Sequence, residues 1–298
     1  MPITISNYKT MAVILITGAN GQLGSELKSI SESFYGYDFI FTDIDELDIT
    51  DPVQTSEFIK KNEPGWIVNC AAYNLVDKAE SEPDKAMLIN STAVMNISES
   101  IKGSACRFIH VSTDYVFNGS TSVPYNENAN PDPQTSYGRS KLAGEKAAML
   151  HNYSMVIRTA WLYSSHGSNF LKTILRKAKE NDSLRVVFDQ IGTPTWAADL
   201  GGAVMNIISS VIRNQIAFNA GIYHYTNEGV CSWYDFATAI VEEAGLKCKV
   251  NPILSGEFMS VAKRPSYSVL DKSKIKENYN LEIPHWRSSL KKCLEQMK

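Results

Sequence analysis

The stretch LITGANGQLG, residues 15–24, decides the fold. It places Gly18, Gly21 and Gly24 directly after an apolar run, 12–17, and at the opening of a segment with helical periodicity. Glycine permits a tight turn and lets backbone N–H groups approach a ligand closely, and a helix N-terminus adds unpaired donors with partial positive charge. The spacing therefore predicts that a pyrophosphate binds here, as in a dinucleotide-binding fold.

The alternation of strand and helix continues from this turn through the first half of the chain. Apolar runs of strand length lie at 37–43, 66–72, 107–113 and 154–161, and segments with helical periodicity lie at 22–34, 51–62 and 136–150. Continuous runs rich in Val and Ile are typical of parallel strands that are buried on both faces. The pattern predicts an α/β fold, a Rossmann-type doubly wound parallel sheet.

Beyond about residue 165 the alternation is less regular. Helical segments at 168–182, 197–212 and 232–245 are separated by short strands such as 220–226, and no break in composition marks a linker. We expect an NAD(P)-binding Rossmann domain over 11–165 and a smaller C-terminal α/β lobe over 166–298 that is mainly substrate-binding. The boundary is soft, and the two parts are expected to share a cleft.

Composition narrows the class of protein. The chain has 298 residues, 20% of them charged, and a formal net charge of -3, which is typical of an ordinary soluble globular protein and does not suggest a nucleic-acid partner. The longest apolar runs, such as 11–16, are much shorter than the roughly 20 residues of a membrane helix. The first ten residues do not resemble a signal peptide, and Met11 is a candidate for the natural start.

The cysteines and histidines show no metal-binding or disulfide pattern. The five cysteines are an odd number without a C-x-x-C pair, and the five histidines lack H-x-x-H or H-E-x-x-H spacing. We therefore predict no protein-built metal site and a reduced, cytoplasmic location.

An acidic residue stands where a dinucleotide fold presents one to the adenosine ribose. Asp43 ends the second strand, 25 residues beyond Gly18. Its carboxylate favours the 2′-hydroxyl of NAD and would repel the 2′-phosphate of NADP unless a nearby cation or a rotated side chain intervened. On electrostatics alone, the cofactor choice leans to NADH. Asp48 and Ile49 follow after a turn and are expected to border the adenine.

A candidate catalytic set combines a strand end with a helix. Thr113 ends the fourth strand, and Tyr137 precedes Lys141 by four residues, which places both on one face of a helix. A Tyr-x-x-x-Lys pair is common by chance, so its position after a dinucleotide turn gives it meaning. A phenol has an ordinary pKa near 10, and a lysine ammonium about 4 to 6 Å away is expected to lower it. In this interpretation Tyr137 protonates the alkoxide formed on a carbonyl substrate, and Lys141 also holds the nicotinamide ribose.

Six motifs in order carry a resemblance to a known family. They are TGANGQLG (17–24), NCAAYNLVDKAESEP (69–83), STDYVFNG (112–119), YGRSKLAGE (137–145), RTAWLYSSHGSNF (158–170) and RPSYSVLD (264–271). From about Met11 to the C-terminus the chain resembles the dTDP-4-dehydrorhamnose reductase family of extended short-chain dehydrogenases/reductases. The resemblance implies NAD(P)H-dependent reduction of the 4-keto group of dTDP-4-dehydro-L-rhamnose to dTDP-L-rhamnose, by a monomer or homodimer.

The resemblance also implies a role for individual residues. The catalytic set is Thr113, Tyr137 and Lys141. The cofactor set lies at the ends of the first four strands and comprises Gly18, Gly21, Gln22, Leu23, Gly24, Asp43, Asp48, Ile49, Ala71, Ala72, Tyr73 and Val111, together with Tyr137 and Lys141. The substrate set comprises Thr113, Asp114, Trp161, Asn169 and Arg264, where the guanidinium of the last suits a nucleotide diphosphate.

Two points of the resemblance stay open. Family members use NADPH, NADH or both, so Asp43 does not settle the cofactor. Some members pair through a magnesium bridge between a glutamate in the first helix and acidic residues after GTPT. Here Glu26 is present, but Ala198 precedes Asp199, so the sequence does not support Mg²⁺ at this interface.

Two rival functions stay open as well. A nucleotide-sugar 4,6-dehydratase or epimerase could share the scaffold, but dehydratases typically carry Glu directly after Thr-Asp, and Tyr115 stands there. A non-catalytic subunit, resembling the regulatory subunit of methionine adenosyltransferase, is the rival of another class. The complete set of Thr113, Tyr137 and Lys141 favours the reductase.

Overall fold

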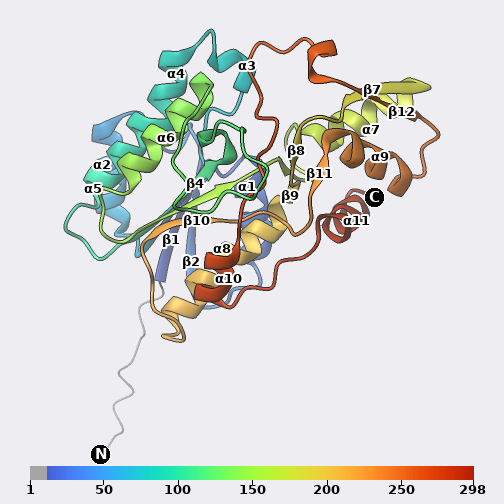
Figure 1. Ribbon diagram of the computed structural model, residues 1–298. Helices are drawn as coiled ribbons and strands as arrows, with labels where there is room; N and C mark the ends of the chain where they lie inside the picture. Colours follow the sequence, from blue (N-terminus) through green and yellow to red (C-terminus); the bar gives the residue numbers. More distant parts are fainter. Residues whose placement is uncertain (1–11) are drawn as a thin grey trace, which may run out of the picture.

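The computed structural model describes residues 12–298 (Figure 1). Met11, the candidate start and the first residue of the expected Rossmann domain, lies outside the described residues. No helix formed by residues 12–298 is both long and apolar enough to cross a lipid bilayer.

A six-stranded parallel sheet forms the centre of the molecule. Its strands are β1 (Ala12–Thr17), β2 (Tyr37–Thr42), β3 (Trp66–Asn69), β4 (Arg107–Thr113), β5 (Ser154–Thr159) and β10 (Gly221–His224), in the order β10-β5-β4-β3-β1-β2. Every neighbouring pair is parallel. The predicted doubly wound α/β sheet is confirmed, and the strand order reverses direction between β1 and β3.

Helices cover both faces of this sheet because its strands are apolar on both sides. Ile14 and Ile16 pack with the buried faces of α1 (Gln22–Ser31) and α8 (Ala197–Ile212). Leu15, between them, packs on the other face with residues of α2 (Pro52–Asn62), α5 (Ala93–Ser100) and α6 (Ser136–Ala148). Adjacent residues of a strand point to opposite faces, so one short run serves two cores.

The smaller lobe has a separate core. It contains α7 (Phe170–Glu180), α9 (Trp233–Glu243) and α11 (Trp286–Gln296), which pack around Phe236 and Leu290. Three short strand pairs complete it: β6 (Leu162–Tyr163) with β9 (Thr195–Trp196), β7 (Ser183–Val187) with β12 (Lys249–Ile253), and β8 (Ile191–Gly192) with β11 (Cys231–Ser232). Figure 1 shows this lobe beside the carboxyl ends of the central strands.

The chain does not divide in space at residue 165. Helix α8 packs against α1, and β10 extends the central sheet next to β5, although both follow the expected boundary. Helix α10 (Ser273–Tyr279) also returns to the main core through Ile275. The run 220–226, expected as a short strand beyond residue 165, forms β10 and pairs with β5 at the edge of the central sheet.

The segment 76–100 holds helices that the sequence analysis did not predict. They are α3 (Val76–Ala79), α4 (Pro83–Met87) and the π-helical turn η1 (Leu88–Thr92), which continues into α5. Several predicted strands also end early, since β3 stops at Asn69 and β5 at Thr159. The residues that follow these strands turn into loops, which is where the ligand cleft of a doubly wound sheet forms.

Candidate active site

A cavity of about 790 Å³ opens at the carboxyl ends of the central strands. It lies where the strand order reverses, between the ends of β1 and β3, and it continues past the ends of β4 and β5 to the smaller lobe. This is the position of the ligand crevice in open α/β sheets. Its size is within the range of small-molecule and cofactor sites.

The glycine turn forms one wall of the cavity, and its shape requires glycine. Gly18 has a φ of +67°, and a Cβ there would lie 2.5 Å from the backbone nitrogen of Ala71, in the loop after β3. A Cβ on Gly24 would lie 2.4 Å from the carbonyl oxygen of Gly18. Two backbone segments therefore meet closely at the start of α1, whose N-cap is Gly21. Its first N–H groups are available to an anion.

The end of β2 is bound to this turn through Asp43. One carboxylate oxygen accepts a hydrogen bond from the backbone N–H of Asn20 at 2.8 Å, and the other accepts from Ile44 at 2.9 Å. Asp43 lines the cavity together with Asp48 and Ile49. The carboxylate thus fixes the turn and also places a negative charge at the cavity edge.

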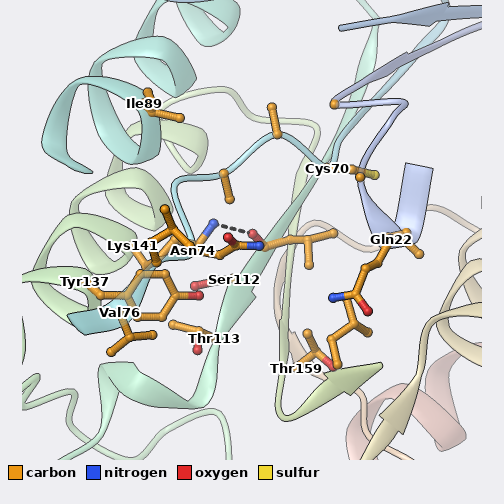
Figure 2. Close-up of a pocket in the computed structure, with 18 of the residues that line it drawn as sticks. Gln22, Cys70, Asn74, Val76, Ile89, Ser112, Thr113, Tyr137, Lys141 and Thr159 are labelled. Carbon is orange, nitrogen blue, oxygen red and sulfur yellow. Dashed lines mark hydrogen bonds between the residues drawn. The ribbon is translucent and has the colours of Figure 1, made fainter. Parts of the chain in front are cut away.

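The three residues of the candidate catalytic set meet at the cavity. Thr113 ends β4 and caps the short 3₁₀ turn η2 (Asp114–Val116), and α6 begins after its N-cap Thr135. Figure 2 shows Thr113, Tyr137 and Lys141 on one side of the cavity, with Gln22 and Thr159 on the opposite side. The helix and the strand end predicted from sequence are therefore adjacent, as a shared carbonyl contact requires.

Lys141 is buried and is held by β4. Its Nζ donates a hydrogen bond to the carbonyl oxygen of Val111 at 2.7 Å, the dashed line of Figure 2. Burial lowers the pKa of Lys141 to about 8, and the Glu145 carboxylate opposes this by favouring the ammonium. Lys141 is the cationic side chain among the described residues that line the cavity.

The predicted lowering of the Tyr137 pKa is wrong in this structure. Loss of hydration raises the pKa of Tyr137 to about 12, a hydrogen bond with Thr113 opposes the rise, and the Asp114 carboxylate adds to it. Lys141 does not lower it, because its ammonium is directed at the Val111 carbonyl. Tyr137 is therefore protonated throughout the neutral range.

Asp114 is a buried carboxyl at the cavity wall. Its Oδ1 accepts a hydrogen bond from the Thr113 hydroxyl at 3.0 Å, and its Oδ2 has no hydrogen-bond partner among the described residues. Burial raises the pKa of Asp114 to about 6, although contacts with the Ser268 and Thr113 hydroxyls oppose the shift. An unpaired buried oxygen at a cavity is available to a ligand hydroxyl.

Two stacked indoles form the wall on the side of the smaller lobe. The rings of Trp161 and Trp233 lie 3.6 Å apart at an interplanar angle of 9°, and both line the cavity with Phe170. Trp161 has a φ of +48°, which is unfavourable for a residue with a side chain, and strain of this kind often accompanies a ligand site. A Cβ on Gly192 would lie 2.6 Å from the Trp161 ring, so glycine makes room for the indole.

Asn169 is occupied by structural hydrogen bonds. Its Oδ1 accepts from the backbone N–H of Lys172 and caps α7, and its Nδ2 donates to Gln22 Oε1 at 2.9 Å and to the Ser164 carbonyl at 2.7 Å. The side chain joins the first helix to the smaller lobe. Its predicted contact with substrate would require one of these bonds to be exchanged.

Most of the predicted cofactor and substrate residues line the cavity, and three do not. Those that line it are Gly18, Gly21, Gln22, Leu23, Asp43, Asp48, Ile49, Ala71, Ala72, Val111, Thr113, Asp114, Tyr137, Lys141, Trp161 and Asn169. Gly24 lies behind the turn. The Tyr73 hydroxyl donates to Glu82 at 2.6 Å, away from the cavity. Arg264 forms a two-pronged contact with Asp77 of α3, at 2.8 Å and 3.4 Å.

Other lining residues were not singled out from the sequence. Trp233, Phe170 and Ser112 are the main ones, with Asn20, Cys70, Asn74, Val76, Ile89 and Thr159. Trp233 stands at the start of a predicted helix, directly after its N-cap Ser232. An aromatic side chain at that position was the one sequence feature that could have indicated a place in the cavity. The others carry no local sequence signal, since only the tertiary fold brings them to the cavity.

The residues that the magnesium interface would use are engaged inside the chain. Glu26 is fully buried; its Oε1 accepts a hydrogen bond from Ser164 at 2.6 Å, and its Oε2 has no partner among the described residues. Asp199 accepts hydrogen bonds from Asn227 and Ser289. Within residues 12–298, no group of three or more His, Cys, Asp or Glu side chains is arranged to hold a metal ion.

The sheet order, the glycine turn and the Thr113, Tyr137 and Lys141 set together define an extended short-chain dehydrogenase/reductase, a nicotinamide-dependent oxidoreductase. Comparison with known proteins places the chain more narrowly. A family profile described as the RmlD substrate binding domain matches residues 11–298.

Two curated relatives and one solved structure match over nearly the whole length. The spore coat polysaccharide biosynthesis protein SpsK of Bacillus subtilis (strain 168) is 40% identical, over 96% of this chain and 98% of the relative. The dTDP-4-dehydrorhamnose reductase of Aggregatibacter actinomycetemcomitans is 39% identical, over 94% and 98%. The crystal structure of dTDP-4-dehydrorhamnose reductase from Bacillus anthracis str. Ames in complex with NADP is 39% identical, with a TM-score of 0.88, and the match covers 96% of this chain and 99% of that chain.

The chain belongs to the dTDP-4-dehydrorhamnose reductase family. The expected family is thereby confirmed.

Proposed function

We propose that the protein reduces the 4-keto group of dTDP-4-dehydro-L-rhamnose to dTDP-L-rhamnose with a reduced nicotinamide cofactor. The observation that carries the proposal is the meeting of Thr113, Tyr137 and Lys141 in a cavity that also holds the dinucleotide turn. Membership of the reductase family supports the choice of sugar.

The cavity fits a dinucleotide. The positive φ of Gly18 keeps the turn free of a side chain, and the start of α1 presents unpaired N–H groups to a pyrophosphate. Gln22 and Leu23 would lie along the pyrophosphate, Asp43, Asp48 and Ile49 around the adenosine, and Val111 and Lys141 near the nicotinamide ribose. When bound, the reduced nicotinamide supplies the hydride.

Tyr137 supplies the proton. Its pKa of about 12 keeps the hydroxyl protonated at neutral pH, so it can donate to the more basic oxygen that forms at C4 of the sugar. Thr113 donates a hydrogen bond to the same oxygen and gives up its bond to Asp114. The phenolate that remains regains a proton from solvent, while Lys141 holds the nicotinamide ribose in this proposal.

The smaller lobe binds the rest of the substrate in this proposal. The stacked Trp161 and Trp233 rings offer an apolar surface to the sugar, and the free Oδ2 of Asp114 accepts a sugar hydroxyl. Arg264 does not line the cavity, so to meet the diphosphate its guanidinium would have to give up its contact with Asp77. Asn169 acts mainly by holding Gln22.

We expect the chain to accept NADH as well as NADPH. Asp43 places a negative charge near the ribose, which opposes a 2′-phosphate. Asp43→Asn removes the charge and keeps an acceptor for the Asn20 N–H, so the ratio of kcat/KM for NADPH over NADH should rise about tenfold or more, equivalent to about 1.4 kcal/mol. An unchanged ratio would contradict this role. Gln22, on the pyrophosphate side, provides the control position, because its replacement should affect both cofactors alike.

The decisive experiment supplies dTDP-4-dehydro-L-rhamnose with NADPH and, separately, with NADH, and follows the loss of reduced-nicotinamide absorbance. Tyr137→Phe should lower kcat by about 10² to 10⁴ while cofactor affinity is kept, because only the proton donor is lost. If neither cofactor is consumed by the wild type, or if Tyr137→Phe is as fast as wild type, the proposal fails.

The rival functions predict other outcomes. A 4,6-dehydratase would release water from the sugar, but Tyr115 stands where dehydratases typically carry glutamate, and its ring packs edge-on against Tyr137 at 5.5 Å. A regulatory subunit would bind a synthetase and show no turnover of any nucleotide 4-ketosugar. The cytoplasmic location and the choice between monomer and homodimer stay predictions.

A further inference from the structure

The two elements that carry the catalytic set, β4 and α6, meet the neighbouring strand β5 at one buried carboxylate. Glu145, on α6, accepts a hydrogen bond from the Ser112 hydroxyl of β4 at 2.6 Å. It also accepts two from the Arg158 guanidinium of β5, at 2.8 Å to Oε1 and 2.7 Å to Oε2. The contact is a two-pronged ion pair with a third donor added from a neighbouring strand.

The cluster is buried, and only Ser112 of its three residues lines the cavity. Ser112, Glu145 and Arg158 are exposed by 3%, 2% and 1%. Removing two charges from water is expensive, and apolar residues of similar volume often stabilise a fold at least as well. The presence of the fully paired Glu145 carboxylate is therefore better explained by its effect on the positions of α6, β4 and β5 than by a gain in the stability of the fold.

The remaining bonds of Arg158 extend the cluster to the loop before α6. The Arg158 guanidinium lies 3.4 Å from Nε2 of His224 on β10, and the other ring nitrogen of His224 lies 3.1 Å from the carbonyl oxygen of Tyr125. Burial and the adjacent Arg158 charge lower the pKa of His224 to about 3, so this histidine is neutral. Loop 118–134, which leads into the Tyr137 helix, is therefore fixed to the same cluster.

The geometry links this cluster directly to the reacting groups. Ser112 immediately precedes Thr113 on β4, and Glu145 follows Lys141 by one helical turn on α6. A displacement of α6 along β4 that moved Tyr137 away from Thr113 would therefore also strain the bond between Ser112 and Glu145. No other polar contact between α6 and the end of β4 is as short as that between Ser112 and Glu145.

We infer that Glu145 is a positioning residue for the reductase reaction: it fixes the helix that carries Tyr137 and Lys141 against the strand end that carries Thr113. The inference rests on the proposed function. Glu145 does not line the cavity, so its expected action is through the residues that it holds.

Glu145 also acts on Lys141 through charge. The titratable groups near Lys141 are Glu145 on the same helix, Cys70 after β3 and His110 on β4. Burial keeps the Cys70 thiol and the His110 ring uncharged, the first by raising its pKa to about 12 and the second by lowering it. Glu145 is thus the charged neighbour that favours the Lys141 ammonium.

The first test is Glu145→Gln. A catalytic group displaced by about 1 Å can lose about 10² in rate, so kcat should fall by about that factor, with KM for NADPH much less affected. Loss of the negative charge lowers the pKa of Lys141 further below about 8. The alkaline limb of the kcat/KM profile should therefore move to lower pH.

The second test isolates one bond of the cluster. Ser112→Ala removes the Ser112 hydroxyl and leaves the ion pair intact, so kcat should fall about tenfold, and Ser112→Thr, which keeps the donor, should recover most of the loss. Ile208→Val, a truncation on the buried face of α8, is the stability control. It should lower Tm without changing kcat or its pH profile.

The outcomes separate the two proposals. NADPH affinity, measured by protein-to-nicotinamide energy transfer, reports on Lys141 without any sugar, and its pH dependence should shift in Glu145→Gln. If the wild type reduces no dTDP-4-dehydro-L-rhamnose but this shift occurs, only the proposed function falls. Unaltered pH profiles in Glu145→Gln, or losses in Ser112→Ala that Ser112→Thr does not recover, would overturn the positioning role.

Discussion

Asp114 shows how a single residue of this site opposes the stability of the fold. Its carboxyl is 2% exposed, and one oxygen has no hydrogen-bond partner in residues 12–298. Because burial raises its pKa from 3.8 to about 6, the folded protein holds the Asp114 proton more tightly than the unfolded chain does. The contribution of this proton to the free energy of unfolding is fully present below about pH 3.8 and is lost as pH rises through about 6.

Asp114→Asn should therefore stabilise the protein at high pH. The variant has no carboxylate to ionise, so its free energy of unfolding should exceed that of wild type by about 1–3 kcal/mol at pH 8. The difference should shrink as pH falls from 8 to 5, while reductase activity is reduced throughout. Denaturant unfolding at pH 5, 6.5 and 8 measures this, and a difference that grows toward low pH would contradict it.

At this scale the sequence predicts what depends on local geometry. The glycine turn and the four-residue spacing of Tyr137 and Lys141 can be predicted from the sequence, because backbone conformation and helical periodicity are local properties. The pKa of Tyr137 cannot be predicted in this way. It depends on loss of hydration, on the buried Asp114 charge and on the direction of the Lys141 ammonium, all of which are set by the packed structure.

At the scale of secondary-structure elements, helix α6, which carries Tyr137 and Lys141, packs very closely against the π-helical turn η1. A Cβ on Gly144 would lie 2.0 Å from the backbone carbonyl oxygen of Asn90. Asn90 in turn donates a hydrogen bond to Ser140 of α6 and accepts one from the backbone N–H of Tyr73. Glycine at position 144 therefore lets α6 approach η1 and keeps the Tyr137 helix at its observed depth.

Gly144→Ala should destabilise the protein, although alanine is the better helix former. The added methyl group forces α6 and η1 apart, and overpacking of this kind costs about 1–3 kcal/mol. Gly202→Ala is the matched control, because Gly202 lies inside α8 with no atom within 4 Å of the added Cβ. It should stabilise by about 0.5–1 kcal/mol. Thermal and denaturant unfolding measure both, and a Tm increase in Gly144→Ala would exclude the close contact.

The elements themselves were predictable to different degrees. Helix α6 and the strands β1 and β4 follow from periodicity and apolar runs, and β4 has the predicted bounds. Helices α3, α4 and α5 were not predicted. Residues 76–100 are interrupted by Pro83 and by several Ser, Asn and Asp residues, and the π-helical turn breaks the 3.6-residue period by which a helix is visible in a sequence.

The whole molecule is closed by a segment that returns from the end of the chain to its first half. Asp77 of α3 receives the Arg264 guanidinium at 2.8 Å and the backbone N–H of Ala262 at 3.0 Å. The Ser260 hydroxyl is also within 3.3 Å of its carboxylate. Figure 1 shows this segment, in orange, passing from the smaller lobe to α3.

Asp77→Ala should release this segment without unfolding the sheet. Partly exposed ion pairs contribute up to about 1 kcal/mol, so the open population should rise about fivefold. Trypsin cleavage after the exposed Lys263 reports the opening, and it should be faster by about that factor. Asp84→Ala on the neighbouring α4 serves as the charge control. Equal cleavage rates in the two variants would show that Asp77 does not hold the segment.

The global arrangement was only partly predictable. The doubly wound sheet and a cleft shared by two lobes follow from the sequence, but a boundary near residue 165 does not describe the spatial division. The run that forms β10 is short and the α8 sequence is almost wholly apolar, so periodicity cannot tell which core receives them. Their placement is decided by long-range pairing with β5 and packing against α1.

The stacked indoles at the cavity wall have a spectroscopic consequence. The protein has five tryptophans, and of these Trp161 and Trp233 line the cavity with their rings 3.6 Å apart. Two chromophores held so closely in parallel planes couple their electronic transitions, which gives a split circular-dichroism band and quenched emission. A ligand that enters beside them perturbs both signals. Occupancy of the cavity can therefore be followed optically in the unlabelled protein, before any turnover takes place.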